Sequence, residues 1–173
     1  MKYWITVASK DHIARGIAGG FMQANHGKQA ALKKVHTGDW VLFYSPKQTM
    51  NGTEPCKAFT AIGQAVGDEI YQHKMSEDFI PWRRNIKFYE STEAPIIPLV
   101  DELDFIINKK SWGYPFRFGF LEIGEQDFEL IKKQMISGVP HPALSFGEGS
   151  KRNEPSTVFS FGEDLGEAVI NHK

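Results

Sequence analysis

The chain has 173 residues, of which 41% are apolar and 24% charged, and this composition predicts one globular, soluble domain. A single cysteine, Cys56, excludes an intramolecular disulfide and any metal site built from several cysteines, while the lack of a long apolar run or a cleavable signal pattern predicts a cytoplasmic protein. The formal net charge of −1 divides into +5 over residues 1–89 and −6 over residues 90–173, so an anionic partner is expected on the N-terminal half.

Two strands are predicted early in the chain, because β-branched and aromatic residues alternate across two faces in residues 3–10 and 38–45. Between them, Ser9 can cap a helix that begins near residue 10 and ends at the glycine pair 19–20. A short basic helix is expected from about residue 27 to residue 36. The buried stripe of the first helix, at spacings of four residues, is Ile13, Ile17 and Phe21.

The rest of the chain adds three strands and two helices. After a turn-rich loop, strands are expected at residues 57–67, 85–89 and 116–123, and helices at residues 99–107 and 126–136. Gly63, within the first of these strands, predicts a bulge or a close approach of the backbone. Five strands with short helices between them suit a small barrel or a highly curved mixed sheet.

Residues 138–173 differ in composition from the rest, since they are rich in glycine and proline and show little periodicity. They predict a C-terminal extension that is extended or partly disordered, with Phe159 and Phe161 as candidate anchors. The domain itself is therefore expected to span residues 1–137.

The chain carries none of the common catalytic, metal or cofactor motifs. The glycines near residue 19 do not form a dinucleotide-binding G-x-G-x-x-G, and Gly27 followed by Lys28 lacks the rest of a phosphate loop. The six histidines show no metal-ligand spacing, and no G-x-S-x-G nucleophile elbow occurs. Cys56 is interpreted as a packing residue. The sequence therefore predicts no catalytic residue, no metal and no cofactor.

Aromatic and basic residues alternate in three places, at residues 82–84, 87–89 and 112–118. A π-face for stacking and a cation for the backbone are what an unpaired or flipped base requires. The alternative is that these aromatic side chains form the core while the cations lie outside.

The residues after the glycine pair point more directly to a pocket. Side chains that follow a helix end commonly face a pocket, and the amides of Gln23 and Asn25 can read base edges through a paired donor and acceptor. Phe21 and His26 belong to the same stretch.

Several stretches of the sequence, and the order of its elements, resemble the EVE domain family of the PUA-like superfamily, whose relatives include the YTH readers of methylated adenine in RNA. The resemblance covers residues 2–136 and implies an α+β fold, a PUA-like curved β-barrel of five to six strands with short flanking helices. The matching stretches are YWITVASK at residues 3–10, GGFMQANHGK at residues 19–28, GDWVLFYSP at residues 38–46, and FRFG, LEI and EQDF between residues 116 and 128.

The same resemblance implies a nucleic-acid-binding reader, whose pocket accepts a modified base flipped out of its polymer. Prokaryotic EVE domains are associated with modified cytosine in DNA, so DNA is expected as the partner rather than RNA. The implied pocket residues are Ser9, Lys10, Phe21, Gln23, Asn25, His26, Tyr44, Ser45, Trp82 and Phe88. The expected phosphate contacts are Lys28, Lys33, Lys34, Arg83, Arg84 and Arg117.

Three other functions stay open. Some members of the related ASCH family resemble amidohydrolases of acylated cytidine; their G-x-K-x-x-T-x-R pattern is not found here, but Thr6, Lys10 and Glu122 are candidates to converge. A reader of N6-methyladenine in RNA is the second function. The third is a protein-interaction module whose acidic second half docks a partner.

Overall fold

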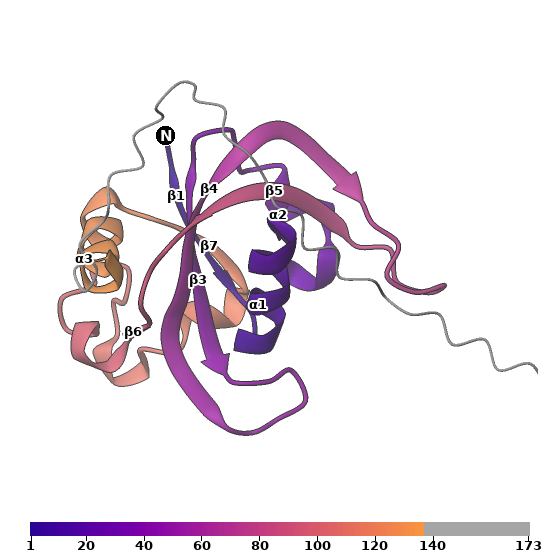
Figure 1. Cartoon of the computed structure of the whole chain (residues 1–173). Coiled ribbons are helices and arrows are strands. Elements are labelled where there is room, and N and C mark those ends of the chain that lie inside the picture. The colour runs from indigo at the N-terminus through magenta and orange to yellow at the C-terminus, as the bar shows by residue number, and fades with distance from the viewer. Residues whose placement is uncertain (137–173) are drawn as a thin grey trace, which may run out of the picture. The chain divides into compact units, whose positions relative to one another are not determined.

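The computed structural model describes residues 1–136, which fold around one curved sheet (Figure 1). Its strands are β1 (Tyr3–Val7), β2 (Phe21–Met22), β3 (Trp40–Lys47), β4 (Pro55–Gln72), β5 (Trp82–Tyr89), β6 (Ala94–Pro95) and β7 (Phe120–Ile123). The α-helices are α1 (Lys10–Gly19), α2 (Gln29–Leu32) and α3 (Glu125–Ile136), and the 3-10 turns are η1 (Asn25–Gly27), η2 (Ile97–Leu99), η3 (Lys109–Ser111) and η4 (Pro115–Phe118). The expected domain boundary at residue 137 and the expected tail, residues 138–173, lie outside the described residues.

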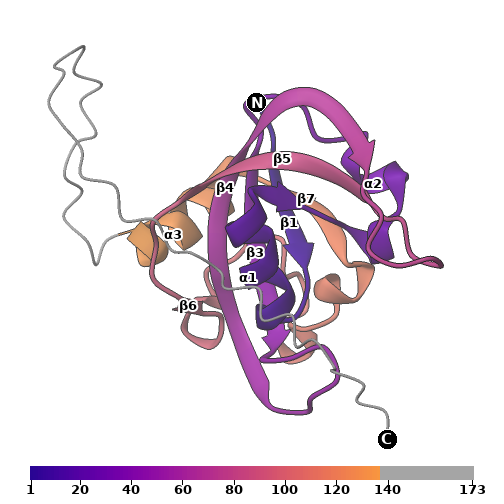
Figure 2. The same ribbon diagram turned by 45° about the vertical axis from the view of Figure 1, so that its right-hand side comes forward.

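The seven-stranded sheet has the order β2-β5-β4-β3-β1-β7, and the short β6 pairs with β4 beside this path. Strands β1 and β3 are parallel, with Ile5 opposite Leu42, whereas the other pairs recorded in residues 1–136 are antiparallel. The long strands β4 and β5 bend together over the rest of the sheet (Figures 1 and 2). Because β1 and β3 are parallel, their C-terminal ends lie at the same edge.

Both faces of the central strands are buried, which explains the nearly continuous apolar runs in β1 and β3. Alternate residues belong to two separate cores: Ile5 and Leu42 lie in the first, and Trp4 and Phe43 lie in the second. Helix α3 and the segment of residues 96–116 contribute to the first core, whereas α1 and α2 contribute to the second. The sheet is thus the middle layer, with helices on both sides (Figure 1).

The prediction of an α+β fold with a curved sheet and few short helices is confirmed. The sheet has seven strands rather than five to six, because the sequence gave no signal for the two-residue strands β2 and β6. Strands β2 and β7 lie at the two ends of the strand order, and no hydrogen-bonded pair within residues 1–136 joins them into a closed barrel.

Helix α1 begins at Lys10 and ends at Gly19, where the left-handed φ of 66° at the following Gly20 terminates it as predicted. Ser9 occupies the N-cap position, but its side chain makes no capping hydrogen bond. Of the predicted stripe only Ile13 is buried within the helix, whereas Ile17 is 44% exposed. The helix instead approaches the sheet through Gly16, where a Cβ atom would lie 2.7 Å from the Phe21 carbonyl oxygen.

The predicted helix at residues 99–107 is wrong. The short turn η2 ends at Leu99, and the following backbone forms isolated turns, such as the Leu103 N–H to Leu99 carbonyl bond at 3.1 Å, that tertiary contacts hold in place. Asp127 of α3 accepts hydrogen bonds from the backbone N–H groups of Asp104 and Phe105, at 2.7 and 3.0 Å. Lys109 Nζ donates to two carbonyl oxygens of the same segment, at 3.0 and 2.7 Å. The apolar residues of segment 99–107 are therefore spaced as in a helix because they anchor a loop in the first core.

Other boundaries differ from the prediction for local reasons. The helix expected at residues 27–36 shrinks to α2, because Gly27 has a φ of 77° and Lys28 is extended. The strand expected at residues 116–123 begins only at Phe120, after Gly119 reverses the backbone with a φ of 72°. The close approach predicted at Gly63 is confirmed, since a Cβ there would lie 2.4 Å from Ile86 Cγ2.

Candidate functional site

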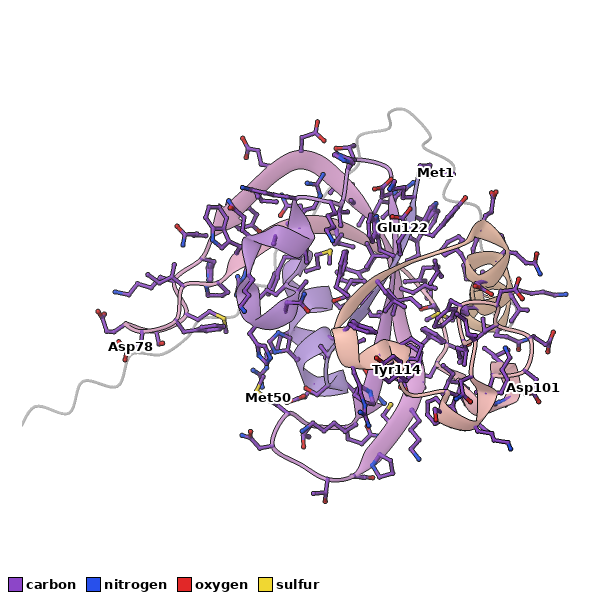
Figure 3. All side chains as sticks on the ribbon, turned by 180° about the vertical axis from the view of Figure 1, so that it is seen from behind. Met1, Met50, Asp78, Asp101, Tyr114 and Glu122 are labelled. Carbon is purple, nitrogen blue, oxygen red and sulfur yellow. The ribbon has the colours of Figure 1, made fainter. Side chains whose placement is uncertain are left out.

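A hollow of about 450 Å³ lies where β1 ends and the chain turns into α1; we call it the ligand pocket. Figure 3 labels Met50, which lines the pocket from the β3–β4 hairpin, and Asp78, which lies at the outer end of the β4–β5 connection that also carries the lining residue Phe79. The residues that line the pocket are Val7, Ala8, Ser9, His12, Gln23, Ala24, Asn25, His26, Gly27, Pro46, Lys47, Met50, Phe79 and Gly119.

The floor of the pocket is the end of β1, which hydrogen bonds fix on both sides. The Val7 N–H donates to the Gly119 carbonyl at 2.9 Å, and the Ala8 N–H donates to the Tyr44 carbonyl at 3.1 Å. Beyond this point His12 Nδ1 is buried without a hydrogen-bond partner among the described residues, whereas the buried Ser9 hydroxyl lies beside the Asp11 carboxyl and lowers its pKa. A buried polar atom without a partner is uncommon in native proteins, so His12 marks the floor as a place for polar contacts.

The η1 turn forms the polar wall. Asn25 and His26 follow one another with φ angles of 47° and 59°, a left-handed conformation that side chains other than glycine rarely adopt. Both residues are exposed at the pocket. Gln23 lines the same wall, and its Nε2 donates to the sulfur of Met75 at 3.7 Å. Strained backbone held in place by its surroundings is typical of functional sites.

The opposite walls are apolar and come from two connections between strands. Met50 on the β3–β4 hairpin is tied to α1, because its N–H donates to Asp11 Oδ1 at 3.1 Å. Phe79 on the β4–β5 connection is 39% exposed and accepts a hydrogen bond from the Met75 N–H at 3.0 Å. Pro46 completes this side. The pocket can therefore hold a flat ring between apolar walls, with polar groups at its edge.

Four of the ten predicted pocket residues meet in the ligand pocket: Ser9, Gln23, Asn25 and His26. Three aromatic residues among the other six, Phe21, Trp82 and Phe88, do not line the pocket and pack against other side chains. The Arg83 guanidinium lies 3.7 Å above the Phe21 ring, and Phe88 packs on Phe43. Trp82 packs against the second core. The aromatic wall of the pocket is supplied by Phe79.

The remaining three predicted residues have other partners. Tyr44 is buried and stacks on Phe116 with a centroid distance of 3.9 Å, and burial raises the pKa of its hydroxyl. Ser45 Oγ lies 2.8 Å from Thr60 Oγ1. Lys10 forms an ion pair with Glu93, and this hydrogen-bonded contact raises the pKa of the lysine.

The predicted phosphate contacts divide into two groups. Lys28, Lys33 and Lys34 are exposed on and beside α2, and Arg117 is exposed in η4. Arg83 and Arg84 are not placed to contact phosphates, because both side chains are buried. Arg84 donates to the Gly67 carbonyl at 2.6 Å. Arg83 lies against Phe21, and burial lowers its pKa.

Sequence reasoning missed several lining residues. His12 carried a usable signal, since it follows Ser9 by three residues and therefore lies on the same side of the first helical turn. Gly119 carried another, because a glycine before a strand suggests close approach; a Cβ there would lie 2.4 Å from Asn25 Oδ1. Met50 and Phe79 lie in connections, where no periodicity indicates which side chains face a pocket, and Pro46 and Lys47 lie at the very end of β3, beyond the strand predicted from the sequence.

The hydrolase candidates do not converge. Lys10 pairs with Glu93, and Glu122 pairs with Lys2 at 3.0 Å on the far end of β1. Thr6 is 1% exposed beneath α1.

Within residues 1–136, no cluster of three or more His, Cys, Asp or Glu side chains could hold a metal ion. In the same residues, no helix is long and apolar enough to cross a membrane.

Comparison with known proteins gives a family and a fold. Residues 2–134 match the family model described as the EVE domain. A UPF0310 protein of Mycolicibacterium vanbaalenii is 50% identical over 143 residues, which are 83% of this chain and 99% of that protein.

Two solved structures are similar at low identity. A Rhodopseudomonas palustris protein solved by NMR has a TM-score of 0.50 at 15% identity, with 82% of this chain and 97% of that chain covered, which supports the fold. Human THYN1, in complex with DNA containing 5-methylcytosine, has a TM-score of 0.45 at 11% identity, with 76% and 95% covered. The second likeness is too weak to argue from.

Proposed function

The chain belongs to the EVE domain family, and from that premise we propose that it is a nucleic-acid-binding reader, whose ligand pocket holds one modified base, a modified cytosine flipped out of DNA. The observation that carries the proposal is the composition of the pocket. Apolar groups of Phe79, Met50 and Pro46 line it together with the hydrogen-bonding groups of Gln23, Asn25 and His12. Flat, partly polar rings are the ligands that such a combination fits.

The energetics support a base as the ligand. Flipping a base out of its stack costs a few kcal/mol, and stacking on an aromatic side chain returns about 1–3 kcal/mol. Burial of one methyl group adds only about 0.8 kcal/mol. Discrimination of the modified base therefore depends on the polar wall, where an ill-fitting ligand leaves Asn25 or Gln23 without a partner.

The cations beside the pocket support a polymeric, anionic ligand. Lys28 directly follows the lining residue Gly27, and the exposed Lys33 and Lys34 follow directly after the short helix α2. Lysines placed in this way neutralise backbone phosphates without reading sequence, and their contribution falls steeply with salt.

The test is fluorescence anisotropy with labelled short oligonucleotides at fixed salt. The set carries cytosine, 5-methylcytosine, 5-hydroxymethylcytosine, adenine or N6-methyladenine, each as DNA and RNA. A tenfold preference for a modified cytosine in DNA, about 1.4 kcal/mol, is the expected result. Equal, salt-sensitive binding to every oligonucleotide would show only a nonspecific basic surface and would contradict the proposal. A preference for RNA with N6-methyladenine would mean that the ligand is methylated adenine in RNA instead of modified cytosine in DNA.

Removal of the aromatic wall tests where the base sits. Phe79→Ala is expected to weaken binding of the preferred oligonucleotide by roughly tenfold to a hundredfold, because one stacking contact is lost. The matched control is Phe118→Ala, since Phe118 is also an exposed aromatic residue, at 61%, but lines a different hollow. Equal losses in both variants would place the base outside the ligand pocket.

A further inference from the structure

His12 lies between two hollows. It lines the ligand pocket and also a small cavity of about 20 Å³ beneath α1, whose other residues include Thr6, Gly16 and Phe43. Two buried polar atoms of this small cavity's residues, Thr6 Oγ1 and His12 Nδ1, make no hydrogen bond to any described residue. Thr6 lies two residues after Trp4 on β1, so both side chains point to the same sheet face, the one that α1 covers.

The size and polarity of the small cavity match one water molecule. A cavity needs roughly 10–15 Å³ to hold a water, and the water needs at least two polar partners. Thr6 Oγ1 and His12 Nδ1 are two such partners from neighbouring elements, β1 and α1. A buried hydroxyl without a hydrogen bond is unfavourable, so the bridge would satisfy both groups at once.

From this geometry we infer that a single internal water joins Thr6 Oγ1 to His12 Nδ1, and that His12 thereby presents its Nε2–H to the ligand pocket as a donor that reads an acceptor atom of the ligand. The inference rests on the proposed function for the identity of that ligand as a base. The inference also names the atom of the base that His12 contacts: a carbonyl oxygen or an unprotonated ring nitrogen, such as O2 or N3 of a cytosine.

The donors available allow an arrangement that satisfies both groups. Thr6 has one O–H donor, from which the water accepts. The water keeps two protons, and the inferred arrangement uses one of them in a hydrogen bond to His12 Nδ1; the opposite tautomer, in which Nδ1–H donates to the water, is distinguished by the histidine spectra described below. A neutral imidazole whose Nδ1 accepts carries its hydrogen on Nε2, so the ring meets the ligand as a donor. Amide oxygens of Gln23 and Asn25 in the same pocket remain free to accept from an exocyclic amine.

The experiment combines ¹⁵N NMR of the histidine side chains with oligonucleotide binding, both on the full chain. His12→Phe assigns the His12 signals by their loss. The parent is expected to show the Nε2–H form of neutral His12, and His12→Phe is expected to weaken binding by about tenfold through loss of one hydrogen bond.

Thr6→Val and Thr6→Ser separate the bridge from simple packing. Thr6→Val keeps the shape but removes the hydroxyl, so it is expected to change the His12 tautomer signals and weaken binding several-fold; Thr6→Ser is expected to preserve both. Thermal unfolding confirms that each variant is folded. An unchanged His12 spectrum in Thr6→Val overturns the water bridge, and parent-like binding by His12→Phe overturns the ligand contact. If the parent binds no oligonucleotide, the proposed function fails, whereas the histidine spectra still decide the bridge.

Discussion

Two consecutive left-handed residues distinguish the polar wall from ordinary turns. Asparagine tolerates this conformation, but a histidine in the left-handed region is strained by about 1 kcal/mol or more. His26 keeps it although the side chain is exposed and the following residue is already a glycine. Stability alone would favour glycine at position 26 as well as at position 27, which suggests that the His26 side chain is kept for a contact in the ligand pocket.

His26→Gly should therefore separate stability from binding. We expect the free energy of unfolding to rise by as much as about 1 kcal/mol, because the strain is removed, while affinity for the preferred oligonucleotide falls. Urea unfolding and anisotropy measure the two effects. Lys57→Gly is the matched control, since Lys57 also has a positive φ, 54°, but does not line the pocket. Weaker binding in the control, or unchanged affinity in His26→Gly, would contradict this explanation.

The contact between α1 and β2 fixes the positions of the pocket residues at the start of α1 and after β2. Ser9 and His12 come from the start of α1, and Gln23 follows β2 directly. Gly16 lets the helix approach Phe21 so closely that no side chain fits between them. A short helix of this kind depends on such packing more than on its own propensity.

Gly16→Ala tests this contact at the level of the element. Alanine is the better helix former by about 1 kcal/mol, but its methyl group would meet a backbone carbonyl, so we expect a net loss of about 1–2 kcal/mol in the free energy of unfolding. Ala14→Gly on the exposed side of α1 measures the propensity effect alone, with the opposite sign. A more stable Gly16→Ala protein would show that the close approach is unnecessary.

The strands that carry the pocket could be predicted, whereas several connections could not. Residues 3–7 and 40–45 have β-branched or aromatic residues at most buried positions, so local preference and burial agree. The segment after Leu99 misled the prediction, because Asp127, which organises it, is more than twenty residues away in sequence. Spacing in a sequence indicates that residues are buried, but not whether the backbone that buries them is helical.

The same distinction applies to the candidate site. Ser9, Gln23, Asn25 and His26 could be placed at a pocket because chain turns leave their side chains no core to enter. Arg83 and Arg84 were assigned to phosphates by their charge, yet the bend of β4 and β5 buries them against Phe21 and the Gly67 carbonyl. Phe79 could not be singled out, because its position depends on how a long connection folds over η1.

At the scale of the whole molecule, the buried carboxylate of Asp39 joins the start of β1, the turn after α2 and the start of β3. Asp39 accepts hydrogen bonds from the backbone N–H groups of Lys2 and His36, at 2.7 and 3.0 Å, and from Trp4 Nε1 at 3.1 Å. Burial alone raises the pKa of this carboxyl, but the three hydrogen bonds outweigh it and hold the pKa below its ordinary value of 3.8. The ionised form is thus favoured in the folded state.

This arrangement predicts loss of stability in acid. Because the unfolded chain binds the proton more tightly, the stabilisation by Asp39 is present above pH 3.8 and declines as the pH falls through the lower pKa of the folded state. Asp39→Asn should lower the free energy of unfolding by about 1–3 kcal/mol at pH 7 and flatten its decline below pH 4. Urea unfolding at a series of pH values measures both. A variant whose decline parallels that of the parent would assign acid sensitivity to other carboxylates.

The parallel pairing of β1 and β3 has a consequence for how ligand preference can change. A parallel pair requires a crossover, and here a single uninterrupted stretch, residues 8–27, supplies the polar wall and the part of the floor that follows β1. The hydrogen-bond ladder of β3, β4 and β5 lies largely outside that stretch. Residues 8–27 thus form an exchangeable cassette: grafted from one family member into another, the cassette should carry much of the ligand preference with it, while the recipient keeps its own sheet.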